Sequence, residues 1–219
     1  MGNRYSDLTK IPADPLSRLM AMADLELSGD VDVPASADTE YVLRALDAAE
    51  KWDEVALVLA VALPQREAAW WSCLAARDYV KFKPKTPMNS IRAAEAWVFD
   101  QSDKTLQDLE AVIEANSPKD KTSLCATAAL YSTGTMGSGE MAKIAAPPSA
   151  VALSVFGMNM LAMSEADDPN THMQWVIDRA LDIARGGNGT IPCPKPMVDE
   201  DEDADADTDN EAELAEEES

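Results

Sequence analysis

The feature that most constrains the fold is an apolar repeat with the period of an α-helix in residues 169–185. Apolar side chains recur there at spacings of three and four residues, which places them on one face of a helix. These side chains are Met173, Val176, Ile177, Ala180, Leu181 and Ala184. Gly186 and Gly187 follow directly and are expected to end the helix. No segment of the chain shows the alternation of a strand or the turn of a hairpin, so the sequence predicts an all-α protein.

Helical patterns extend over most of the chain. They predict helices at residues 15–25, 39–51, 52–63, 64–80, 90–100, 103–115, 118–132, 150–163 and 169–185. Short connections between such segments are typical of a compact multi-helix bundle, here of about eight helices. Residues 52–63 and 150–163 are apolar on nearly all sides and are expected in the core. Composition agrees, because only 5% of residues are aromatic and the good helix formers Ala, Leu and Met are abundant.

Negative charge is concentrated at the C-terminal end. The chain carries a net charge of −22, and residues 199–219 contain 13 acidic residues with no Lys or Arg. Such a segment buries too little apolar surface to offset the entropy of ordering, so we expect a disordered tail. The sequence therefore predicts three parts: a Pro-punctuated N-terminal segment with one short helix (1–37), a helical domain (38–187), and a linker with the acidic tail (188–219).

Charge and hydropathy disfavour several classes of function. Direct nucleic-acid binding is not expected, because it depends on Lys and Arg that neutralise phosphates. The longest apolar run, residues 55–63, is too short to span a bilayer, so no membrane span is expected. Cys73, Cys125 and Cys193 lack the spacing of a metal or redox motif, which fits a reducing compartment. We expect a cytoplasmic protein.

No catalytic, cofactor-binding or metal site is expected from the motifs. Residues 134–139 match the glycine spacing of a P-loop, but Glu140 stands where the phosphate-binding Lys would be needed. The single histidine, His172, cannot form a His-based metal cage alone, and we expect it at the surface or at a helix start. Asp178 and Asp182 are expected on the solvated face of the last helix.

Two adjacent tryptophans are the most unusual local feature. Side chains of neighbouring residues on a helix point about 100° apart, so Trp70 and Trp71 cannot both face the same way. One can join the core while the other reaches a neighbouring helix or a partner, although both could also serve internal packing. We expect a protein-contact surface around Trp70, Trp71 and Arg77.

Three segments resemble an uncharacterised bacterial all-helical domain-of-unknown-function family. They are LPQREAAWWSCL (63–74), AAEAWV (93–98) and ALDIARG (180–186), similar to that family's L-P-x-R-E-A-x-W-W, A-E-A-W-V and L-D-I-A-R-G segments. The similarity covers roughly residues 40–187, and the family's W-S-G-G-S-L-A-P loop is matched only loosely by YSTGTM (131–136). Members of the family occur near genes for type VI secretion and for phosphopeptide-binding regulators. The resemblance implies an accessory, adaptor or chaperone-like role and carries no catalytic residue.

These observations favour a non-enzymatic protein-interaction module, with secretion-apparatus components as possible partners. One alternative is an acidic mimic that binds a basic protein through its tail. The tail could equally be a solubility extension, or an intramolecular cover for a basic groove. Another alternative is an enzyme with a cryptic polar site, formed for instance by Arg66, Glu67 and Arg77, which would require a deep polar pocket.

Overall fold

The computed structural model describes residues 3–117 and 119–194, which form nine α-helices and one short 3₁₀-helix. The elements are α1 (Leu16–Met22), α2 (Thr39–Ala48), α3 (Trp52–Ala62), α4 (Gln65–Phe82), α5 (Asn89–Phe99), α6 (Asp103–Ala115), α7 (Ser123–Tyr131), η1 (Gly139–Lys143), α8 (Ala150–Ser164) and α9 (Pro169–Ala184). Among these residues there is no strand, only an isolated bridge between Thr135 and Ala145. The predicted all-α fold is confirmed. The expected acidic tail lies outside the described residues.

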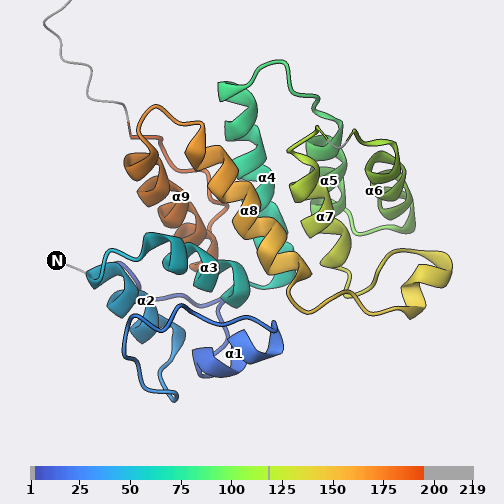
Figure 1. The fold of residues 1–219 in the computed structure, drawn as a ribbon. Coiled ribbons are helices and arrows are strands. Elements are labelled where there is room, and N and C mark those ends of the chain that lie inside the picture. Colours follow the sequence, from blue (N-terminus) through green and yellow to red (C-terminus); the bar gives the residue numbers. More distant parts are fainter. Residues whose placement is uncertain (1–2, 118, 195–219) are drawn as a thin grey trace, which may run out of the picture.

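Helix α8 is the centre of the bundle and packs against α3, α4, α7 and α9 (Figure 1). Helices α5 and α6 cover α7 on one side, while α3 and α9 lie on the other, with α1 and α2 below α3 in that view. The close approach of α7 to α8 follows from small buried side chains on α7: Cys125, Ala126, Ala128 and Ala129. Helix α3 is buried on most sides, as its uniform apolarity predicts.

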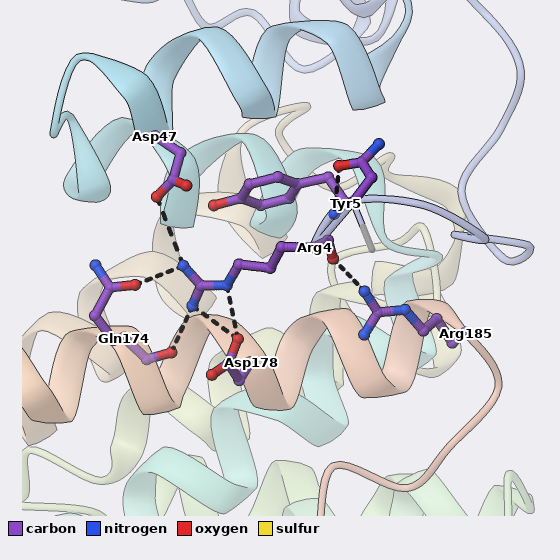
Figure 2. A network of polar contacts seen from close by, with 7 residues as sticks. Arg4, Tyr5, Asp47, Gln174, Asp178 and Arg185 are labelled. Carbon is purple, nitrogen blue, oxygen red and sulfur yellow. Dashed lines mark hydrogen bonds and ion pairs between the residues drawn. The ribbon is translucent and has the colours of Figure 1, made fainter. Parts of the chain in front are cut away.

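The N-terminal residues 3–11 lie across the outer face of α9 and are held by long-range contacts (Figure 2). Arg4 Nε donates to Asp178 Oδ1 at 2.8 Å, and its Nη1 donates to Gln174 Oε1 at 2.6 Å. From α9's C-terminal end, Arg185 donates to the carbonyls of Arg4 and Ser6. The segment is therefore an integral part of the folded body.

Tyr5 anchors the same segment in the core. Its side chain is only 2% exposed and belongs to the main apolar cluster. Its hydroxyl is buried and makes no hydrogen bond among the described residues. Burial raises the pKa of Tyr5 above its ordinary value; Arg4 nearby lowers the pKa, and Asp47 raises it further.

One predicted helix start differs clearly from the structure. The helix expected from residue 118 begins at Ser123, and Pro118 lies outside the described residues. Before it, the buried carboxylate of Asp120 accepts hydrogen bonds from Ser90 Oγ at 2.7 Å and from the Thr122 backbone N–H at 3.0 Å. These bonds stabilise a turn, which delays the helix.

The connection between α7 and α8, residues 134–148, projects from the body (Figure 1). Within it, Met136 N donates to Ile144 O and Ala146 N to Gly134 O, so the segment folds back on itself. Ser138 donates through its backbone N–H and its hydroxyl to the carboxylate of Glu110 on α6. Most of the segment remains exposed, including Met141 and Ile144.

Candidate functional site

Trp71, one of the three expected contact residues, lies in the core. Its side chain is 1% exposed, and its Nε1 donates to the Val176 carbonyl of α9 at 3.1 Å. A buried indole with a satisfied N–H contributes packing between α4 and α9. Trp71 therefore presents no surface to a partner in this fold.

Trp70 faces outward, as the angular separation of adjacent helical residues requires. It is half-buried, and its Nε1 donates to the Asn188 carbonyl at 2.7 Å. Its ring meets the edge of Phe99, the last residue of α5, with centroids 5.2 Å apart and planes at 64°. Phe99 is 70% exposed, the largest exposed fraction of any large apolar side chain in residues 3–117 and 119–194.

These two rings border a hollow of about 340 Å³. We call it the Trp70–Phe99 surface and define it by Lys10, Arg66, Glu67, Trp70, Phe99 and Asn188. Two of its charges pair with each other, since Lys10 Nζ lies 3.1 Å from Glu67 Oε1. Arg66 Nε donates at 2.7 Å to the Val98 carbonyl in the last turn of α5, where a cation is favoured by the helix dipole. The surface is thus an aromatic patch with a rim of partnered charges.

Arg77 lies on another part of α4. Eleven residues separate it from Arg66, which corresponds to roughly 16 Å along the helix axis. Its guanidinium pairs with Glu95 of α5, with Nη2 donating to Oε2 at 2.6 Å, and this hydrogen bond raises the pKa of Arg77. Arg66, Glu67 and Arg77, the three residues considered for a cryptic enzyme site, therefore do not converge on one pocket.

A buried polar cluster connects α4 and α9. Asp78 pairs with Arg179, and it also accepts from Lys81 Nζ at 2.8 Å. Arg179 Nε donates to the Gly189 carbonyl at 3.0 Å, and its guanidinium lies 4.3 Å from the Trp175 ring centroid. These contacts hold the chain that follows α9 against the body, so the cluster has a structural role.

His172 lies next to this cluster. It does lie in the first turns of α9, but it is only 7% exposed, packed between the rings of Phe82 and Trp175. Of the two positions expected for His172, the helix start is the one found; the side chain is not at the surface, because the end of α4 covers this side of α9. Burial lowers the pKa of His172, while Asp78 raises it and Arg179 lowers it further.

The two acidic residues expected on a solvated face are half-exposed and engaged. Asp178 pairs with Arg4, and Asp182 Oδ2 accepts from Gly189 N at 2.9 Å. Nowhere in residues 3–117 and 119–194 do three His, Cys, Asp or Glu side chains gather as a metal site would require. None of the helices described has the length and apolarity needed to cross a membrane.

The described residues form an all-helical domain with an exposed aromatic patch. The chain belongs to the family of unknown function DUF6931, whose model matches residues 42–184. The match confirms the resemblance to an uncharacterised domain family. It includes Trp70, Arg77 and Phe99, whereas residues 3–11 precede it. No curated protein matches the chain, and neither does any solved structure.

Proposed function

We propose that this protein is a non-enzymatic interaction module that docks a protein partner through the Trp70–Phe99 surface. The observation that carries the proposal is the exposure of Phe99 against the half-buried ring of Trp70. Leaving a large aromatic side chain in water forgoes roughly 2 kcal/mol of burial free energy. Aromatic residues dominate the binding energy of protein interfaces, particularly where surrounding polar groups exclude water.

The charges around the patch support a mode of binding based on apolar contact. Lys10 and Glu67 already neutralise each other, and Arg66 already has a carbonyl partner. A docked protein would not need to supply counter-charges, and it would leave no newly unpaired charge at the rim. We expect the affinity to depend weakly on salt, because few net charges take part.

We further propose that the partner is a component of a bacterial type VI secretion apparatus and that the protein acts in the cytoplasm as an accessory, adaptor or chaperone-like subunit. This step is supported by the resemblance to a family whose members occur near such genes. The choice of docking surface and the choice of partner can be tested separately. The surface is inferred from the exposure of its side chains, whereas the partner is inferred from the family resemblance.

The test is co-purification from the native lysate with three baits: the full chain, Phe99→Ser and Met22→Ser. Met22 is a matched control because it is 67% exposed and lies on α1, outside the Trp70–Phe99 surface. We expect the full chain and Met22→Ser to retain the same secretion component and Phe99→Ser to lose it. Equal thermal unfolding of the three baits would show that the loss is local. Retention by Phe99→Ser would refute the surface, and capture of an unrelated protein by Phe99-dependent contact would refute only the secretion assignment.

A further inference from the structure

Half of the chain's ten lysines gather at one end of the bundle. Lys81, Lys83 and Lys85 lie at and just beyond the end of α4, and Lys119 and Lys121 precede α7. The first loop joins α4 to α5 and the second joins α6 to α7. The two loops lie side by side at the same end of the bundle (Figure 1). All five lysines are exposed. We call them the lysine cluster.

A groove of about 550 Å³ lies within the cluster. Its lining includes Tyr79, Phe82, Lys83, Lys85, Lys119 and Asp120. It is a second site, distinct from the Trp70–Phe99 surface, and shares no lining residue with it.

The acidic groups near this groove are already engaged. Asp120 is buried and hydrogen-bonded to Ser90 and Thr122. Asp78 pairs with Arg179 and Lys81, and Glu165 Oε2 lies 2.6 Å from Lys83 Nζ. Lys85, Lys119 and Lys121 make no ion pair within residues 3–117 and 119–194. The groove therefore carries uncompensated positive charge on a protein that is acidic overall.

The chain leaving α9 runs toward this groove. Asn188 accepts from Trp70 near the start of α4, and Gly189 packs against Leu74, one turn further along. Arg179, which holds the Gly189 carbonyl, also binds Asp78, three residues before Lys81. From Asn188 to Gly189 the chain thus runs along α4 toward its C-terminal end, where the lysine cluster lies.

We propose that the groove within the lysine cluster binds the acidic segment 199–219 of the same chain. That segment has 13 carboxylates and no cation, so it is complementary in charge to the groove. The 25 residues after 194 can span roughly 80 Å when extended, more than enough to reach it. Tethering gives the segment an effective concentration at the groove on the order of millimolar. A separate polyanion would need a similar concentration to compete, and it would also be repelled by the net negative charge of the protein.

Binding of residues 199–219 would cover the basic groove. A partner with an acidic peptide would gain access to the groove only by displacing residues 199–219, and the exchange would be sensitive to salt. The groove and the Trp70–Phe99 surface are independent sites, because they involve different residues and different forces.

The test is zero-length carbodiimide coupling of the full chain, followed by peptide mass spectrometry of the monomer band. Carbodiimide joins a lysine amine to a carboxylate only when the two are in direct contact. The ion pairs Lys83–Glu165 and Lys143–Glu140 serve as internal positive controls. Lys104, an exposed lysine on α6 away from the cluster, reports random encounters.

We expect peptides from 199–219 to be coupled to the lysine cluster several-fold more than to Lys104, and this preference to disappear at about 1 M salt, where the screening length falls to about 3 Å. In the variant Lys85→Gln/Lys119→Gln/Lys121→Gln, coupling of the segment to Lys81 and Lys83 should fall several-fold, while Lys104→Gln leaves it unchanged. Equal coupling to all exposed lysines would overturn the proposal, and so would coupling found only between two chains.

Discussion

Residues 3–11 and residues 134–148 both lie outside the α-helices, yet they relate to the body in opposite ways. The first is pinned through Tyr5 in the core and through Arg4 on α9. The second is held mainly by Glu110 and by its own backbone bonds, and most of its side chains are exposed. What distinguishes them is whether a large side chain is buried and whether charged groups find partners far along the chain.

The N-terminal segment also contributes to the burial of α9. Its outer face would be solvated if the N-terminal segment were absent, and instead it is covered by that segment (Figure 2). Together with α3, α4 and α8, this segment leaves α9 buried on most sides. Irregular backbone can therefore complete a helical core, and its removal should cost as much as the loss of a core side chain.

The largest expected effect follows from Tyr5→Ala. Removing a buried aromatic side chain should lower the free energy of unfolding by about 3–5 kcal/mol. The matched change in the other segment, Ile144→Ala, removes a half-exposed side chain and should stay within about 0.5 kcal/mol. Tyr5→Phe separates packing from polarity. Because the buried hydroxyl has no hydrogen-bond partner in residues 3–117 and 119–194, its removal should be neutral or stabilising. Urea unfolding measures all three, and equal values for Tyr5→Ala and Ile144→Ala would contradict the comparison.

A smaller effect is expected from Arg4→Met. The guanidinium bonds Gln174 and Asp178 and lies 3.5 Å from Asp47, but it is partly exposed, so screening limits the loss to about 1 kcal/mol. Lys143→Met breaks the exposed Lys143–Glu140 pair in the other segment and should leave the unfolding midpoint unchanged. A midpoint that shifts as much for Lys143→Met as for Arg4→Met would show that the two segments are held alike.

Acidification should loosen α9 while sparing residues 134–148. Burial lowers the pKa of folded His172 below the ordinary value of 6.5, so below that pH the unfolded chain binds the proton more readily. The contribution of neutral His172 to the free energy of unfolding is fully present above pH 6.5 and is lost as the pH falls below 6.5. Amide exchange in α9 should speed up between pH 7 and pH 5.5 after correction for intrinsic rates. His172→Phe should remove that response, and an unchanged pH response would refute the assignment.

A local opening with little change in stability is expected from Glu110→Ala. The change removes both acceptors of Ser138, so residues 134–148 should open without loss of the core. Trypsin should then cut after Lys143 faster, with the free energy of unfolding changed by no more than about 0.5 kcal/mol. Cleavage after Arg4 and Lys10 should stay slow in the same digest, and accelerated cleavage there would contradict independent attachment of the segments.

Local patterns were sufficient for most helices, because each depends on its own residues. The helix predicted at 103–115 has those bounds in the structure, where Ser102 accepts from the Thr105 backbone N–H as its N-cap. The burial of Tyr5 and His172 could not be predicted in this way. Tyr5 packs because Arg4 finds partners some 170 residues away, and no sequence periodicity reports such a contact.

The candidate site was predictable in part. The 100° rule separates Trp70 from Trp71 correctly, although it cannot say which of them faces the core. Phe99 was missed, yet its signal was present: it falls off the apolar stripe of α5 formed by Ile91, Ala94 and Val98. An aromatic residue on the polar side of an amphipathic helix is a candidate for contact with another surface. The meeting of Phe99 with Trp70 required the three-dimensional structure.

Site-specific photo-crosslinking tests the central claim, docking through the Trp70–Phe99 surface, most directly. Phe99 would be replaced by p-benzoylphenylalanine in the full chain, with Met22 replaced in a parallel control, and both would be irradiated in the cells that naturally produce the protein. We predict that position 99 yields one discrete crosslinked product, which contains a type VI secretion component. We predict that position 22 does not yield this product. The same products at both positions, or none at position 99, would contradict the claim.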